Sequence, residues 1–174
     1  MNRIETLTFR QMDEAAAQEI VAWRYDPPYD VYNHDPTDVE ASVRGLLTRD
    51  YHYYSVWDAA LGLIGFVCYG EDARVPGGDY AHVDGADPLD VGWGLRPDLT
   101  GQGLGPSFIK AALRFARHRW APPAFRATVA AFNRRGFRVC EKVGFRQVDR
   151  FERPGDRRRF VILTRQAEDP SGTV

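Results

Sequence analysis

The sequence is short of lysine, of cysteine, of net charge and of long hydrophobic runs. Its 174 residues carry 23 basic and 24 acidic side chains, for a formal net charge of −1. That balance excludes the broad basic surface that nucleic-acid or membrane-surface binding requires. No apolar run approaches the ~20 residues of a membrane helix. The two cysteines, Cys68 and Cys140, are too few for a disulfide framework or a zinc site, so we expect no bound metal. The N-terminal segment lacks the apolar core of a signal peptide, and the expected location is the cytoplasm.

The chain has the length and the hydrophobic content, 44%, of one domain. We predict a single domain over residues 1–165 and a polar C-terminal tail over 166–174. Apolar and alternating runs predict strands at 3–10, 51–58, 61–70, 89–95, 125–131, 146–152 and 158–164. Helices are expected after Asp13, from 35–40, over 101–120 and after Asn133. This order predicts a mixed α/β fold with helices packed on a central sheet.

Several local patterns make sharper predictions. Asp13 and Asn133 are expected to be helix N-caps, and Thr37 and Glu40 have the spacing of a capping box. Residues 72–87 are rich in Gly, Pro and Asp, which predicts an exposed, mobile loop. Gly144 follows the last helix at the position of a left-handed cap.

The strongest signal is the turn that joins the strand at 89–95 to the helix at 101–120, ending in TGQGLG at 100–105. Glycines let another group approach the backbone closely, unpaired amides point outward, and the helix dipole adds positive potential. Phosphate is the natural ligand of such a turn. An ordinary strand-to-helix connection is the alternative.

Three phosphate ligands compete for this turn. A P-loop requires Gly-Lys-Ser/Thr, which residues 102–104 do not supply. A dinucleotide fold requires GxGxxG and an acid about 20 residues later. Here the glycines are at 101, 103 and 105, and residues 126–131 contain no acid. The third candidate is the pyrophosphate of coenzyme A.

Residues 90–105 resemble the first motif of the GNAT N-acetyltransferase superfamily, a strand followed by Arg/Gln-x-x-Gly-x-Gly/Ala. Thr100 stands at the first position of that motif, where Arg or Gln is usual. Residues 133–145, NRRGFRVCEKVGF, resemble the second signature of the family, an Asn-capped helix ending in Glu-Lys-x-Gly-Phe. The two motifs stand in the family's order and at about its spacing, and the resemblance covers most of residues 3–165.

The resemblance implies a GNAT-like fold, whose mixed, mostly antiparallel sheet has helices on both faces. It also implies a V-shaped acetyl-CoA cleft between the strands at 89–95 and 125–131. By position, Leu95 and Arg96 would bind the acetyl carbonyl and pantetheine through backbone groups. Asn133 would contact pantetheine, or would only cap its helix. The amides that would hold the pyrophosphate belong to Gln102, Gly103, Leu104 and Gly105.

Acetyl transfer needs a base for the amine and an acid for the departing thiolate. Asp90, where the family often has an acid, and Glu71, at the end of the preceding strand, are the base candidates, unless each is a solvated strand end. Cys140 stands where the family often has a tyrosine acid. Its thiol is either that acid or a small residue packed on Phe145, and we favour packing.

The acceptor is expected to bind at the loop between the first two helices. Four aromatic residues there would form a wall for an apolar or cationic amine: Trp23, Tyr25, Tyr29 and Tyr32. The alternative is a hydrophobic cluster that anchors the loop.

We therefore expect an acetyl-CoA-dependent N-acetyltransferase that acts on a small-molecule amine or a peptide N-terminus by direct attack in a ternary complex. A non-catalytic acyl-CoA-binding sensor or interaction domain is the alternative, and a nucleotide-binding enzyme is a weaker third. No nucleic-acid or membrane partner is expected, and an exposed sheet edge would permit a homodimer.

Overall fold

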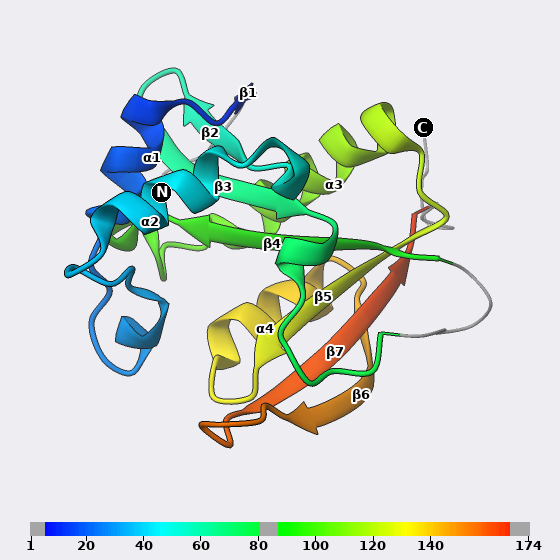
Figure 1. The fold of residues 1–174 in the computed structure, drawn as a ribbon. Coiled ribbons are helices and arrows are strands. Elements are labelled where there is room, and N and C mark those ends of the chain that lie inside the picture. The colour runs from blue at the N-terminus through cyan, green and yellow to red at the C-terminus, as the bar shows by residue number, and fades with distance from the viewer. Residues whose placement is uncertain (1–5, 81–86, 168–174) are drawn as a thin grey trace. The chain divides into compact units, whose positions relative to one another are not determined.

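The computed structural model describes residues 6–80 and 87–167, which fall into two compact units (Figure 1). Unit 1 contains the chain up to Tyr69 together with Trp93–Gly105, and unit 2 contains Gly70–Gly92 and the chain from Pro106 onward. The chain passes between the units within β4 (Leu89–Leu95). The expected domain bounds of 1–165 stay a prediction.

Unit 1 is an antiparallel sheet with two helices. β1 (Leu7–Gln11) pairs with β2 (Tyr54–Asp58), and β2 pairs with β3 (Gly62–Tyr69). The helices α1 (Glu14–Val21) and α2 (Val39–Leu47) contact each other (Figure 1). Short 3-10 turns occur at η1 (Tyr29–Tyr32), η2 (Arg49–Tyr51) and η4 (Pro97–Leu99).

The core of unit 1 is built on one face of α1. Asp13 caps this helix by accepting a 2.8 Å hydrogen bond from the amide of Ala16, as the sequence predicts. The apolar residues of α1 follow a helical period, so they share a stripe that is buried. The buried cluster contains Met12, Ala16, Ala17, Ile20, Val21, Trp23, Leu46 and Leu63.

Unit 2 is built on β5 (Ala124–Ala130), which pairs antiparallel with β7 (Arg159–Gln166) along its whole length. β7 pairs in turn with β6 (Arg146–Glu152). β4 runs parallel to β5 through two residue pairs, Leu89 with Phe125 and Asp90 with Arg126. The unit also contains η3 (Glu71–Ala73), α3 (Gly105–Trp120) and α4 (Arg134–Lys142), and α4 lies beside β5 and β7 in Figure 1.

The strands follow the order β1-β2-β3-β4 in unit 1 and β4-β5-β7-β6 in unit 2. Four of the described strand pairings are antiparallel and the β4–β5 pairing is parallel. The predicted mixed, mostly antiparallel sheet with helices is therefore confirmed. Among the described residues, no helix is long and apolar enough to cross a membrane.

Two predictions about helix starts are wrong. The N-cap of α2 is Asp38, which accepts a 3.1 Å hydrogen bond from the amide of Ala41. Thr37 takes no part in a capping box, because Asp35 binds both its amide and its hydroxyl, at 2.8 and 2.7 Å. The helix α3 begins at Gly105 rather than at 101, because Gly101 and Gly103 adopt positive φ angles that a helix cannot contain.

Two segments that were expected to be loose make ordered contacts in their described parts, and both expectations stay predictions. In the described part of the 72–87 loop, the hydroxyl of Tyr80 lies 3.0 Å from that of Thr128 on β5, which anchors the segment; residues 81–86 lie outside the described residues. At the C-terminus, β7 continues to Gln166, and the amide of Ala167 donates to the carbonyl of Pro123 at 3.0 Å. The rest of the expected tail, 168–174, lies outside the described residues.

Candidate functional site

The glycine-rich turn closes unit 1 and leads into α3. Gly101 and Gly103 have φ angles of +74° and +79°, in the left-handed region that glycine favours. A Cβ built on Gly103 would meet no atom within 4 Å, so the backbone is open on that side. Within the described residues, the amides of Gly103 and Leu104 have no hydrogen-bond acceptor. An open backbone, free amides and the start of a helix are the features of an anion site.

The side chains of this turn are engaged within the protein, so the backbone amides are the groups that could bind an anion. Gln102 donates through its side-chain amide to the carbonyl of Asp98 at 2.6 Å. The side chain of Leu104 is buried, and Gly105 is the first residue of α3. The four residues predicted to hold pyrophosphate are thus consecutive at the entry to the helix.

The backbone groups of Arg96 are already engaged in unit 1. Its amide donates to the carbonyl of Ile64 at 2.8 Å, and its carbonyl accepts from the amide of Leu99 at 2.9 Å. Its guanidinium binds the carboxylate of Asp98, with the Nε–Oδ1 distance at 2.7 Å. These bonds give Arg96 a structural role at the end of β4 and leave its amide unavailable to pantetheine.

The first helix–loop–helix is tied to the same end of β4. Tyr25 donates its hydroxyl hydrogen to the carbonyl of Leu95 at 2.8 Å, and burial raises the pKa of this tyrosine. Asn33 holds the loop closed, since its side chain accepts from the amide of Tyr25 at 2.7 Å and donates to its carbonyl at 3.2 Å. The loop is therefore closed on itself by Asn33 and is tied to the end of β4 by Tyr25.

The four aromatic residues of this loop have different surroundings. Trp23 is in the core of unit 1, with its ring 6.4 Å from that of Phe66, so it anchors the loop rather than lining a surface. Tyr25 is half-buried, whereas Tyr29 and Tyr32 belong to η1 and Tyr32 is 41% exposed. Tyr29 and Tyr32 are the two that remain candidates for an acceptor wall.

In unit 2, the second family signature forms the capped helix that its sequence predicts. Asn133 accepts a 2.8 Å hydrogen bond from the amide of Gly136, which makes it the N-cap of α4. At the other end, Gly144 has a φ of +90°, and the amide of Phe145 donates to the carbonyl of Cys140 at 3.0 Å. This is the predicted Schellman cap.

The side chain of Cys140 is wholly buried inside unit 2. Its exposed fraction is 0%, and burial raises the pKa of its thiol from 9.0 to about 12. A thiol with that pKa and no solvent contact is a poor proton donor at neutral pH. The surroundings of Cys140 therefore favour packing over acid catalysis.

Asp90 is not a solvated strand end but the centre of a buried ion-pair network in unit 2. Arg126 donates to its two carboxylate oxygens at 2.6 and 2.7 Å, and Arg74 donates at 2.8 Å. The exposed fractions of the Asp90 and Arg126 side chains are 2% and 1%. Both carboxylate oxygens are occupied by guanidinium groups and shut off from solvent, so this geometry favours a structural role for Asp90.

Glu71 lies beyond the end of β3, as the first residue of η3, and is exposed. It is close enough to Arg74 to raise the pKa of that guanidinium, so the two base candidates face the same arginine. Among the described residues Glu71 forms no ion pair with an N–O distance within 4.0 Å. Its carboxylate is thus the more available of the two.

Sequence reasoning missed Arg126, Arg74 and Tyr80. Arg126 stands alone in an otherwise apolar strand, FRATVAA at 125–131, and a lone charge in such a strand signals a buried partner. It also missed Phe66, whose ring packs on Gly94: a Cβ at that glycine would lie 2.3 Å from the ring. The signal in the sequence was the pair of glycines around Trp93, because a glycine within a strand often marks a close approach by another group.

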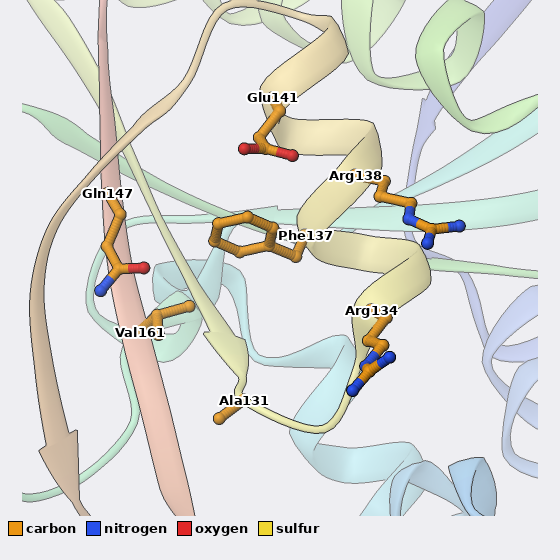
Figure 2. Close-up of a pocket in the computed structure, with 7 residues that line it drawn as sticks. All are labelled: Ala131, Arg134, Phe137, Arg138, Glu141, Gln147 and Val161. Atoms are coloured by element: carbon orange, nitrogen blue, oxygen red, sulfur yellow. The ribbon is translucent and has the colours of Figure 1, made fainter.

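A hollow of about 330 Å³ lies beside α4 in unit 2, and Figure 2 shows the residues that line it. It is lined by Ala131, Arg134, Phe137, Arg138, Glu141, Gln147 and Val161. No residue predicted to bind the coenzyme or the acceptor is among them. No group of three or more His, Cys, Asp or Glu in the described part of the chain could hold a metal.

A family model of the acetyltransferase (GNAT) domain matches residues 6–146. The chain belongs to the GNAT acetyltransferase family. The match ends at the first residue of β6 and includes both motifs, the glycine turn and the helix capped by Asn133. A comparison with curated proteins gives no match.

Solved structures that resemble this GNAT chain share its fold at low sequence identity. A GNAT acetyltransferase from Bacillus anthracis is 17% identical with a TM-score of 0.69, over 96% of this chain and 98% of that one. An aminoglycoside acetyltransferase in complex with coenzyme A is 17% identical with a TM-score of 0.70, over 92% and 95%. A dodecameric spermidine N-acetyltransferase from Vibrio cholerae is 18% identical with a TM-score of 0.62, over 92% and 94%.

Proposed function

We propose that this GNAT enzyme transfers the acetyl group of acetyl-CoA to the primary amine of a small molecule or a peptide N-terminus, by direct attack in a ternary complex. The observation that carries the proposal is the turn at 101–105, where the open side of Gly103 and the free amides of Gly103 and Leu104 lie in the family's pyrophosphate-binding motif. A phosphate there would accept hydrogen bonds that no described protein group takes.

In unit 1, the amides of 102–105 are the proposed ligands of the pyrophosphate. For Asn133 of unit 2, contact with pantetheine is a separate proposal that rests on the family signature alone. Two backbone groups predicted to bind the coenzyme are already engaged: the Leu95 carbonyl accepts from Tyr25, and the Arg96 amide donates to Ile64. We therefore propose that Leu95 and Arg96 hold the end of β4 in place and do not bind the coenzyme through these groups. The acetyl carbonyl would then meet other backbone groups of the strand.

In the proposed reaction, the neutral amine attacks the thioester carbonyl carbon. A C–N bond forms, the C–S bond breaks, and the coenzyme leaves as a thiolate that must gain a proton. Glu71 is the proposed base, acting through a water, because its carboxylate is exposed and the Asp90 carboxylate is held by two arginines. Solvent or a tyrosine of η1 supplies the thiolate proton, since Cys140 is buried.

The acceptor is proposed to be a cationic amine that contacts Tyr29 and Tyr32. Two proteins of similar fold act, by their names, on aminoglycosides and on spermidine, which are amines of this kind. Aromatic side chains attract such cations through their ring faces. We also propose a cytoplasmic location and a homodimer formed through a sheet edge, which light scattering of the purified chain would test.

The identity of the donor is tested by ligand-induced stabilisation. Millimolar acetyl-CoA should raise the melting temperature by several degrees, whereas ATP and NAD should not. A ligand that binds the folded state and not the unfolded state stabilises the folded protein. A rise with ATP or NAD and none with acetyl-CoA contradicts the proposal.

Direct attack is tested by the intact mass of the protein after incubation with acetyl-CoA alone. No acetyl adduct should form, because neither buried cysteine is placed to carry one. An acetylated cysteine that transfers its group when an amine is added would replace the ternary complex by a covalent route.

A further inference from the structure

The guanidinium of Arg96, the residue that follows β4, joins the end of that strand to β3 within unit 1. Its Nη1 atom donates to the backbone carbonyls of Leu61 and Leu63, at 2.9 and 2.8 Å. Its backbone amide donates to the carbonyl of Ile64 at 2.8 Å. The side chain is 23% exposed, so these bonds are partly sheltered from water. Backbone and side chain together tie Arg96 to one short stretch of chain, 61–64.

The same guanidinium holds the 3-10 turn η4, which begins at the next residue. Its Nε and Nη2 atoms donate to the two carboxylate oxygens of Asp98, at 2.7 and 3.1 Å. The backbone carbonyl of Arg96 accepts a 2.9 Å hydrogen bond from the amide of Leu99, whose side chain is buried. The planar fork of an arginine can bind a carboxylate along one edge and carbonyls through its remaining nitrogen, so one side chain fixes both the strand and the turn.

A side-chain hydrogen bond continues from η4 to the glycine turn. Gln102 donates through its side-chain amide to the backbone carbonyl of Asp98 at 2.6 Å. The two residues after Gln102 are Gly103 and Leu104, which carry the free backbone amides of the turn. A continuous set of hydrogen bonds therefore runs from β3 through Arg96 and Asp98 to the residue next to those amides.

The glycine turn has little packing of its own to hold its shape. Gly101 and Gly103 have positive φ angles, and a Cβ at either would meet no atom within 4 Å. Glycine loses more backbone freedom on ordering than any other residue, so arranging such a turn for a ligand costs free energy. A support that arranges the turn before the ligand arrives removes part of that cost from binding.

We propose that Arg96 is a positioning residue for the coenzyme: through Asp98 and Gln102 it holds the glycine turn in the shape that binds pyrophosphate. This inference rests on the proposed function, in which the amides of 102–105 bind that group. Arg96 does not touch the ligand in this scheme. It acts through the turn whose shape it sets, so its loss should weaken the binding of acetyl-CoA and leave the chemical step unchanged.

The test compares Arg96→Gln with Arg24→Gln. Arg24 is also in unit 1, and its Nη1 atom likewise donates to two backbone carbonyls, those of Val21 and Trp23, at 2.8 and 2.7 Å. Each substitution removes a guanidinium and its bonds to two carbonyls, but only Arg96 is joined to the glycine turn by the hydrogen bonds described. Calorimetry gives the acetyl-CoA Kd of each folded variant.

For Arg96→Gln we expect the acetyl-CoA Kd to rise at least about fivefold, with Arg24→Gln within about twofold of wild type. In the transferase assay the acetyl-CoA KM should rise with the Kd, and kcat at saturating acetyl-CoA should stay within about twofold of wild type. Hydrogen exchange at the Leu99 amide should accelerate about tenfold or more in Arg96→Gln, because η4 loses its support.

Gln102→Ala is a second variant, which leaves Arg96 in place and alters an exposed side chain. It removes the bond to Asp98 and keeps the backbone amide, so the acetyl-CoA Kd should rise at least about threefold. Its control is Gln18→Ala, because Gln18 is also exposed and donates through its side chain to Glu14 at 3.2 Å on α1. The control should bind acetyl-CoA as wild type does. This pair decides the question if Arg96→Gln does not fold.

The double variant Arg96→Gln/Gln102→Ala shows whether the two side chains act together. Its acetyl-CoA Kd should rise by less than the product of the two single effects, because both substitutions break the same set of hydrogen bonds. Two unrelated losses of structure would instead multiply in full, and that result would contradict the positioning role.

Other results also overturn the inference. Unchanged acetyl-CoA affinity in Arg96→Gln and Gln102→Ala does so, as does an equal loss of affinity in Arg96→Gln and Arg24→Gln, or a fall in kcat alone. If the wild type does not bind acetyl-CoA, the proposed function fails first and the inference fails with it. A wild type that binds acetyl-CoA, with variants that bind it equally well, rejects the role of Arg96 alone.

Discussion

The hydroxyl of Tyr25 donates to the backbone carbonyl of Leu95 across 2.8 Å, although the two residues are 70 positions apart in the chain. The bond joins the loop after α1 to the end of β4 within unit 1. Burial raises the pKa of Tyr25, so the phenol keeps the proton that it donates at every physiological pH.

Replacing this tyrosine should destabilise unit 1 without removing its ring from the structure. Tyr25→Phe should lower the free energy of unfolding by about 1 kcal/mol, because the Leu95 carbonyl loses its donor. Urea unfolding measures the change, with Tyr51→Phe as the exposed control. Equal stability of the two variants would mean that the bond contributes nothing measurable.

The ion-pair network around Asp90 makes a larger prediction. Asp90→Asn leaves Arg126 buried with no carboxylate, and such a change typically costs about 3–5 kcal/mol of stability. Asp156→Asn is the matched control, because its carboxylate also pairs with two arginines but is 39% exposed.

The control should lose much less stability than Asp90→Asn, since exposed ion pairs contribute little. Urea or thermal unfolding of both variants checks the difference. If Asp90→Asn is as mild as Asp156→Asn, the network does not hold β4 to β5 as described.

The glycine turn is tested by two glycines with nearly equal backbone angles. Gly103 has a φ of +79° and Gly62, the first residue of β3, has a φ of +74°; a Cβ at either meets no atom within 4 Å. Valine at either site should strain the backbone by about 1–3 kcal/mol. Only Gly103→Val should also weaken acetyl-CoA binding, because its side chain projects where the phosphate is proposed to lie.

Calorimetry on the folded variants gives both affinities. We expect the acetyl-CoA Kd to rise at least about tenfold in Gly103→Val, equivalent to ~1.4 kcal/mol, and to stay unchanged in Gly62→Val. Similar affinities for the two variants would remove the turn from the proposed site.

Local signals predicted local structure well. Asp13 and Asn133 cap their helices as expected, and Gly144 ends α4 with a left-handed residue. These features depend on residues three or four positions apart, so a short stretch of sequence contains all the information. The predicted cap of α2 was wrong, because Thr37 and Asp38 are both residues that cap helices well. Asp35 binds the amide of Thr37, which leaves Asp38 as the cap.

Long-range features could not be predicted from the sequence. Arg126 meets Asp90 from 36 positions away, and only the parallel pairing of β4 with β5 brings them together. The density of aromatic residues after α1 gave no information on which rings face the core. Trp23 continues the buried stripe of α1, whereas Tyr32 lies in a 3-10 turn and is exposed.

The buried thiol of Cys140 predicts a pH dependence of stability. Its pKa is raised from 9.0 to about 12 in the folded protein, so folding favours the protonated thiol. The stabilisation is complete below the unfolded value of 9.0 and is lost progressively as the pH rises toward 12.

Between about pH 8 and about pH 10, the wild type should lose ~1.4 kcal/mol more stability than Cys140→Ala, which has no thiol to ionise. The difference between the two proteins cancels the buried tyrosines, which both retain. Parallel pH profiles would show that the thiol is not shielded as the structure indicates.

Catalysis by Cys140→Ala separates packing from acid chemistry. The variant should lose on the order of 1 kcal/mol of stability and keep most of its activity, because a buried thiol donates no proton at neutral pH. A fall of more than about tenfold in the rate of the folded variant would assign Cys140 the acid role.

The account depends most directly on amine-dependent release of coenzyme A. The wild type, at saturating acetyl-CoA, should release free thiol at a rate that rises with added spermidine, aminoglycoside or peptide amine and saturates. Gly103→Val, assayed at the same acetyl-CoA concentration, should need more donor to reach that rate. If acetyl-CoA binds but no amine raises thiol release above the background hydrolysis, the chain is a coenzyme-binding domain and the transferase account is wrong.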